Sequence, residues 1–124
     1  MAEHNELGKN GENFAVEFLE GKGYQIIARN WRCGNNELDI VALDGDILVF
    51  VKVKTRFTDY INPRTSKSKS KIRNFVNAVN LYIRKMQVNS NFRLDVVIIV
   101  MQGGFDNKSM YVEHYEDAIL PTDL

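Results

Sequence analysis

The hydrophobic positions follow a helical period in two parts of the chain. Over residues 7–22 apolar side chains recur three and four positions apart, and Gly21 and Gly23 then end the pattern. After residue 70 a second stripe predicts another helix that packs on a core. The members of this stripe are Ile72, Phe75, Val76, Val79, Ile83 and Met86.

Apolar runs bounded by turn residues predict five strands. The expected ranges are residues 24–31, 38–43, 46–55, 92–101 and 110–114. Residues 47–51 are apolar at every position, which indicates a central strand covered on both faces. The order of elements predicts an α/β fold, a mixed sheet flanked by helices, in a single domain over residues 1–124.

The Asp-Gly pair at residues 44–45 is the strongest hairpin signal in the chain. If these two residues form the loop, the register places Asp39 opposite Phe50 and Glu37 opposite Lys52. Since side chains alternate between faces, four charged residues are expected to converge on one face of adjacent strands. They are Glu37, Asp39, Lys52 and Lys54.

Two interpretations of this charged cluster are open. In the structural one, Glu37 and Lys52 form a cross-strand ion pair, and Lys54 or Arg56 neutralises Asp39. In the functional one, Asp39 binds a divalent cation, and Lys54 positions or activates the attacking water beside a phosphate. Mg²⁺ prefers oxygen ligands, which the Asp39 carboxylate and a backbone carbonyl of the next strand can supply.

Charge adds one feature, because the two signs are segregated. The 124 residues include 16 basic and 16 acidic ones, yet residues 52–73 hold eight bases and a single acid. The eight bases are Lys52, Lys54, Arg56, Arg64, Lys67, Lys69, Lys71 and Arg73. They form either a positive patch for phosphate or a solvated run of charge, since residues 57–70 are predicted to be a flexible loop.

Several protein classes are excluded by composition. No apolar run reaches the roughly 20 residues of a membrane span, and the polar, acidic start of the chain is unlike a secretory signal. Cys33 is the only cysteine, so no intrachain disulfide can form. We therefore expect a cytoplasmic protein with no membrane partner. His4 and His114 are interpreted as surface residues, and Arg93 and Asp95 as an ion pair on one strand.

Six segments, in chain order, carry a family resemblance. They are Leu7-Gly8-Lys9-Asn10-Gly11-Glu12, Gly23-Tyr24, Arg29-Asn30-Trp31-Arg32, Glu37-Leu38-Asp39-Ile40, residues 49–56 and Arg93-Leu94-Asp95-Val96-Val97. Together they resemble the YraN-like family, an uncharacterised bacterial group placed in the restriction-endonuclease-like PD-(D/E)XK superfamily. The resemblance covers nearly the whole chain and implies an αβββαβ nuclease core related to Holliday junction resolvases.

The resemblance also implies roles for particular residues. By position, Asp39 matches the metal-binding aspartate and Lys54 the catalytic lysine, while Glu12 matches an extra acidic group on the first helix. Lys71 falls near a helix lysine for which DNA contact is expected. Lys52 departs from the family pattern, which reads Phe-Val-Glu-Val-Lys where this chain has Phe-Val-Lys-Val-Lys at residues 50–54. Asn36 also replaces the usual glycine before the Glu-Leu-Asp segment.

The substitution at Lys52 places an ammonium where a carboxylate would help to hold a metal ion. At about 4 Å and an effective dielectric near 20, two unit charges interact by roughly 4 kcal/mol. A divalent ion experiences twice that repulsion, so we expect metal affinity to fall by orders of magnitude. The expected protein therefore binds nucleic acid, with DNA as the partner, and its metal-dependent phosphodiester hydrolysis is impaired.

Phosphate contacts are expected from Lys52, Lys54, Arg56 and residues 64–73, with weak sequence preference. An alternative is an active, resolvase-like endonuclease dependent on Mg²⁺ or Mn²⁺. It would use Asp39, Lys54 and a relocated carboxylate from Glu12 or Glu37. A third interpretation is a protein-interaction module with a vestigial site, in which Met110-Tyr111-Val112 forms the edge of a homodimer.

Overall fold

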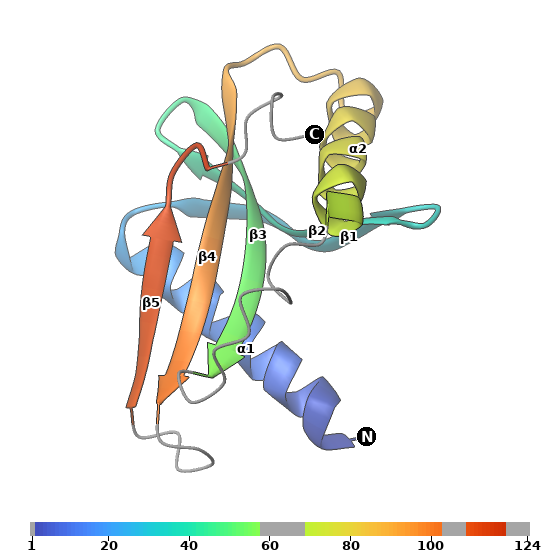
Figure 1. Ribbon diagram of the computed structural model, residues 1–124. Helices are drawn as coiled ribbons and strands as arrows, with labels where there is room; N and C mark the ends of the chain where they lie inside the picture. Colours follow the sequence, from blue (N-terminus) through green and yellow to red (C-terminus); the bar gives the residue numbers. More distant parts are fainter. Residues whose placement is uncertain (1, 58–68, 103–108, 119–124) are drawn as a thin grey trace.

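A single five-stranded sheet with a helix on each face organises the part of the chain that the computed structural model describes, residues 2–57, 69–102 and 109–118 (Figure 1). The elements are α1 (Ala2–Gly21), β1 (Gln25–Cys33), β2 (Asn36–Asp44), β3 (Ile47–Phe57), α2 (Lys69–Lys85), β4 (Phe92–Gln102) and β5 (Ser109–Tyr115). The strand order is β1-β2-β3-β4-β5, with β3 and β4 parallel and the other neighbours antiparallel. The predicted mixed α/β architecture is confirmed, and it is consistent with a restriction-endonuclease-like core.

The core lies in two apolar clusters, one under each helix. Because side chains alternate along β3, Val49 and Val51 face α1, whereas Leu48 and Phe50 face α2. The Phe50 ring meets Tyr82 of α2 edge to face, with centroids 5.5 Å apart. In Figure 1, α1 passes behind the sheet and α2 stands against β1 and β2. The prediction of a central strand covered on both faces is confirmed.

The second helix ends earlier than its apolar stripe predicted. Met86, expected in the core, lies beyond the last residue of α2 and is 52% exposed. Gln87 adopts a φ of +51°, and the amide of Val88 donates to the carbonyl of Ile83, which is typical of a helix C-terminus. Over the described residues, neither helix is long and apolar enough to cross a bilayer.

The hairpin between β2 and β3 differs in register from the expected one by two residues. Asp44 pairs with Ile47, so the loop consists of Gly45 and Asp46 rather than Asp44 and Gly45. Gly45 has a φ of +62° and occupies the first loop position, where a type II′ turn places a glycine. A loop beginning at Asp44 would instead have required a positive φ at an aspartate.

Candidate functional site

The candidate site lies at a fork between two strands. Regular pairing of β2 with β3 extends only to Ile40 and Val51, and beyond that point β2 turns away with β1 (Figure 1). At the fork the amide of Val53 donates a hydrogen bond of 2.9 Å to Oδ2 of Asp39. A side-chain carboxylate thus takes the place of a β2 backbone acceptor, which fixes the Asp39 side chain on β3.

The corrected register brings Asp39 level with Lys52 instead of Phe50, which pairs with Val41. A shift of two residues leaves the face of each side chain unchanged, so the expected meeting of opposite charges still occurs. Nζ of Lys52 lies 3.5 Å from Oδ2 of Asp39, and the two side chains are 29% and 17% exposed. This ion pair is therefore partly shielded from water.

Glu37 does not join this group. It lies opposite Arg32 in the β1–β2 hairpin, and its Oε1 is 3.7 Å from Nε of that arginine. The predicted ion pair between Glu37 and Lys52 is therefore wrong, because the register places Asp39 beside the lysine. Arg56, one of two cations expected to neutralise Asp39, instead pairs with Glu113 of β5 at 3.1 Å.

Helix α1 contributes an acidic residue next to the fork. Glu12 is 15% exposed and lies 3.4 Å from Nη2 of Arg29 in β1. Burial raises the pKa of the Glu12 carboxyl, the nearby Asp39 raises it further, and Arg29 opposes both effects. Glu12 and Asp39 are thus close enough to repel each other.

Only some of the remaining bases of the predicted patch lie within the residues that the structure describes. Lys54 follows Lys52 on the same side of β3 and lies level with Ile98 of β4. Arg73 is exposed on α2. Lys69 and Lys71 belong to the first turn of that helix, whereas Arg64 and Lys67 lie outside the described residues.

A divalent cation does not fit the fork as these side chains are arranged. Within residues 2–57, 69–102 and 109–118, no group of three or more His, Cys, Asp or Glu side chains is suited to hold a metal. The Lys52 ammonium already neutralises Asp39, while arginines pair with Glu12 and Glu37. The metal-binding role of these three carboxylates stays a prediction that the geometry does not favour.

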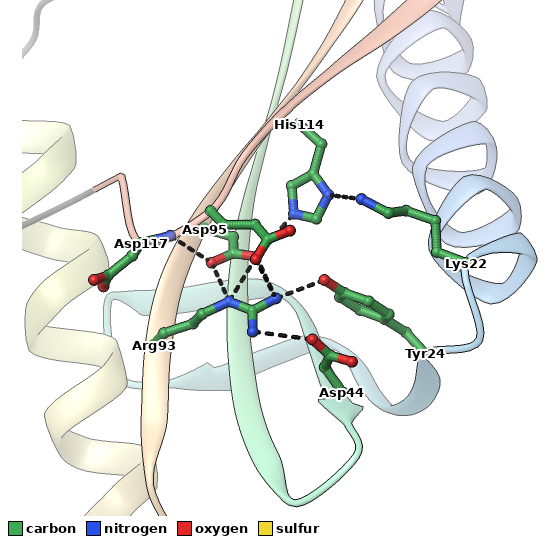
Figure 2. A network of polar contacts seen from close by, with 8 residues as sticks. Lys22, Tyr24, Asp44, Arg93, Asp95, His114 and Asp117 are labelled. Carbon is green, nitrogen blue, oxygen red and sulfur yellow. Dashed lines mark hydrogen bonds and ion pairs between the residues drawn. The ribbon is translucent and has the colours of Figure 1, made fainter.

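A second polar cluster is centred on Asp95 of β4. The sequence predicted only one of its contacts, the ion pair between Arg93 and Asp95. The Asp95 carboxylate is fully buried and accepts hydrogen bonds from Nε of Arg93 (3.0 Å), Nε2 of His114 (2.8 Å) and the amide of Asp117 (2.9 Å) (Figure 2). The His114 side chain is only 4% exposed, so its assignment to the surface is wrong. The signal available in the sequence was an aspartate within the apolar run 94–101, because a charge in a buried strand needs partners.

The Asp95 cluster extends to the loop after α1. Nζ of Lys22 lies 2.8 Å from Nδ1 of His114, and an ammonium can only donate. We therefore assign the imidazole proton to Nε2, which donates to Asp95. Arg93 also donates to Asp44 at 3.0 Å and to the Tyr24 hydroxyl. Figure 2 shows side chains from the ends of β2, β4 and β5 converging with Lys22 and Tyr24, which lie between α1 and β1.

Electrostatics favour the charged form of this cluster. Burial alone would raise the pKa of the Asp95 carboxyl, but hydrogen bonds from His114, Arg93 and the Asp117 amide outweigh it and hold the pKa below its ordinary value. Burial also disfavours the charged form of Arg93 and would lower its pKa. The hydrogen bonds to Asp95 and Asp44 outweigh burial and raise the pKa above its ordinary value. The cluster is therefore a network of charges that fastens several elements together.

Comparison with known sequences places the chain in a family. The family described as "Uncharacterised protein family UPF0102" matches residues 11–99. The chain belongs to this family. A UPF0102 protein of Flavobacterium psychrophilum is 41% identical over 119 residues, covering 95% of this chain and 97% of the relative. One of Bacteroides thetaiotaomicron is 42% identical over 122 residues, covering 98% of each chain.

The UPF0102 match spans the whole fork but only part of the Asp95 cluster. It includes Glu12, Asp39 and Lys52 at the fork, as well as Asp95, but it ends before β5 and His114. The predicted family resemblance is confirmed at this level. Membership of the nuclease superfamily, and with it the roles assigned to the fork, stays a prediction.

Proposed function

We propose that this UPF0102 protein binds DNA through the phosphate backbone, on a nuclease-like scaffold in which Lys52 impairs metal-dependent phosphodiester hydrolysis. The observation that carries the proposal is the ion pair between Lys52 and Asp39, whose charged atoms are 3.5 Å apart. A cation of the protein itself lies beside the carboxylate that a metal ion would otherwise neutralise. The fork is therefore suited to an anion more than to a second cation.

Electrostatic magnitudes support this choice. At an effective dielectric near 20, a unit positive charge about 4 Å from a divalent ion costs roughly 8 kcal/mol, before relaxation of solvent and side chains. The Lys52 side chain is long and 29% exposed, so turning it toward water reduces that cost without removing it. A phosphate, in contrast, gains from the same ammonium.

Cations at alternate positions of β3 supply the phosphate contacts. Lys52, Lys54 and Arg56 lie on one side of the strand, about 7 Å apart from one to the next. Contacts to phosphate carry little sequence information, and each neutralised phosphate releases counterions. The proposed binding is therefore weakly sequence-selective and strongly dependent on salt.

The test is a titration of fluorescently labelled DNA duplexes of two unrelated sequences at several salt concentrations. We expect similar affinities for both, with the logarithm of the binding constant falling by about 0.9 per phosphate contacted for each logarithmic unit of salt. Arg56→Ala is expected to reduce that slope by about one contact. Arg84→Ala, which removes an exposed arginine in the last turn of α2, is the matched control. Absence of binding at low salt to the duplexes and to their separated strands would refute the proposal.

A second candidate is an active endonuclease that depends on Mg²⁺ or Mn²⁺. It is favoured by one observation, the raised pKa of Glu12, to which the neighbouring Asp39 contributes. Cleavage of branched and linear DNA by the native chain and by Lys52→Glu separates the two candidates. If only Lys52→Glu cleaves, Lys52 is what silences the site. Cleavage by the native chain that Asp39→Ala abolishes would instead establish the endonuclease.

A further inference from the structure

Strands β3 and β5 carry a row of cations and a row of tyrosines on one face of the sheet. Side chains alternate along β5, so Tyr111, Glu113 and Tyr115 share a face. Through the paired residues of β4, Tyr111 is level with Arg56, and the ion pair of Arg56 with Glu113 crosses β4 on that face. We name this set the cation–tyrosine face; its members are Lys52, Lys54, Arg56, Tyr111, Glu113 and Tyr115.

The tyrosines of this face are exposed even though the opposite face of the same strand is packed. Tyr111 is 42% exposed and Tyr115 48%, whereas Met110 and Val112 pack on the cluster under α1. Among the described residues, the cluster under α2 reaches along β4 only to Val96. Figure 1 shows α2 beside β1 and β2, away from β5. The two rings thus present aromatic surface beside positive charge.

We propose that the cation–tyrosine face binds single-stranded DNA, with bases stacked on Tyr111 and Tyr115 and phosphates on the cations of β3. This inference rests on the proposed function and names the form of DNA that is bound. Proteins that bind single strands combine a positive track for the backbone with aromatic side chains on which bases stack. Both elements are present here, two strands apart, on one face.

Spacing favours an unpaired strand over a duplex. Tyr111 and Tyr115 are four residues apart on a strand, which corresponds to about 13–14 Å. Bases within a duplex are stacked at roughly 3.4 Å and cover one another, so they cannot offer ring faces to both tyrosines. A single strand whose bases are unstacked can offer a base to each tyrosine. The cations lie two strand spacings from the tyrosines, roughly 9.5 Å, which separates the contacts to phosphate from those to bases.

Glu113 is the acidic member of this face and opposes phosphate. It pairs with Arg56 at 3.1 Å. A bound phosphate therefore competes with Glu113 for the arginine. Removing that charge should release Arg56 for phosphate, so Glu113→Gln is expected to strengthen the binding of single-stranded DNA.

The experiment compares a labelled single strand of about 15 nucleotides, within the usual range of single-strand sites, with the same strand annealed to its complement. Anisotropy is measured for the full chain and for Tyr111→Leu, Tyr115→Leu and the double variant. We expect tighter binding of the single strand by the native chain, and a loss of about 5- to 150-fold for each lost stacking contact. Tyr111→Phe and Tyr115→Phe keep the ring and are expected to keep the affinity.

The outcomes distinguish this inference from the function on which it rests. If DNA binds with a salt dependence but the duplex is preferred, or the leucine variants bind as the native chain does, this inference alone is overturned. If no DNA binds at low salt, the proposed function is overturned as well. Light scattering addresses a third outcome, in which the leucine substitutions dissociate an oligomer without weakening DNA binding. The face would then be a contact between copies of the chain, and the inference would be overturned.

Discussion

Lys52 and Asp39 form an ion pair of 3.5 Å at the point where β2 leaves β3. The same atom, Oδ2 of Asp39, also accepts a hydrogen bond from the Val53 amide. The Asp39 carboxylate therefore has a charge partner and a fixed orientation, both supplied by β3. We therefore expect the charge at position 52 to control what the fork binds, and this expectation can be tested without an assay for activity.

Replacing Lys52 by glutamate is expected to make stability depend on metal. Without metal, the new carboxylate repels Asp39 and lowers the melting temperature. With Mn²⁺ at about 100 times its dissociation constant, binding adds about 2.7 kcal/mol to the free energy of unfolding. Thermal unfolding with and without Mn²⁺ measures this gain, and Lys52→Gln is the matched control that adds no carboxylate. An equal gain in the native chain would contradict the prediction.

Loss of the buried carboxylate in Asp95→Asn is expected to destabilise the fold by about 3–5 kcal/mol near neutral pH, because Arg93 loses a buried charge partner. The pKa of Asp95 lies below its ordinary value of 3.8, so its contribution to stability is present above that pH and is lost as the pH falls through the lower, folded-state pKa. Denaturant unfolding from pH 7 to pH 2 should show a weaker acid dependence in the variant.

The exposed turn residue Asp46 offers a matched control for this experiment. Asp46→Asn changes the same chemical group and is expected to alter the free energy of unfolding by no more than about 0.5 kcal/mol. A similar effect of both substitutions would mean that the Asp95 cluster does not fasten the fold.

Glu12→Gln is expected to stabilise the fold near neutral pH, whereas Asp95→Asn destabilises it. Burial and the neighbouring Asp39 raise the pKa of Glu12, so its charged form lowers the stability of the folded state above that pKa. The uncharged variant should therefore melt slightly higher at neutral pH. This advantage should vanish as the pH falls through the raised pKa, where native Glu12 becomes neutral too. A lower melting temperature at pH 7 would show that the contact with Arg29 dominates.

Gly11→Ala tests how closely α1 approaches β3. A Cβ at Gly11 would lie 2.8 Å from Oγ1 of Thr55, a stiff β-branched side chain. We expect a loss of about 1–3 kcal/mol from overpacking, despite the better helix propensity of alanine. Adding Thr55→Ala should restore part of this loss in a double-mutant cycle. Gly21→Ala, with nothing within 4 Å, is the control and should be nearly neutral.

The order and type of the elements could be predicted because each apolar period reports which side of an element meets the core. The register of the β2–β3 hairpin could not. Asp44-Gly45 and Gly45-Asp46 are both acceptable two-residue loops, and a shift of two leaves the alternation of faces unchanged. The sequence thus predicted that Asp39 meets a cation of β3, but it named Lys54 or Arg56 as that cation and assigned Lys52 to Glu37.

The full Asp95 cluster could not be predicted from local sequence patterns, for a different reason. Its members come from separate segments, with His114 19 positions and Asp44 49 positions from their partners. No short spacing connects them, so an ion pair between Arg93 and Asp95 was the only part that the sequence could predict. Burial of His114 became evident only when β5 was placed beside β4.

The parallel pairing of β3 with β4 has a consequence for the order of folding. The antiparallel hairpins β1–β2 and β2–β3 need only short loops, whereas Leu48 meets Phe92 only after the chain has returned through α2. Closing that longer segment is slower, and it must precede the contact between Arg93 of β4 and Asp44 of β2. We therefore expect substitutions in β4 and β5 to act mainly on the late, rate-limiting phase of refolding. The first three strands can associate without them.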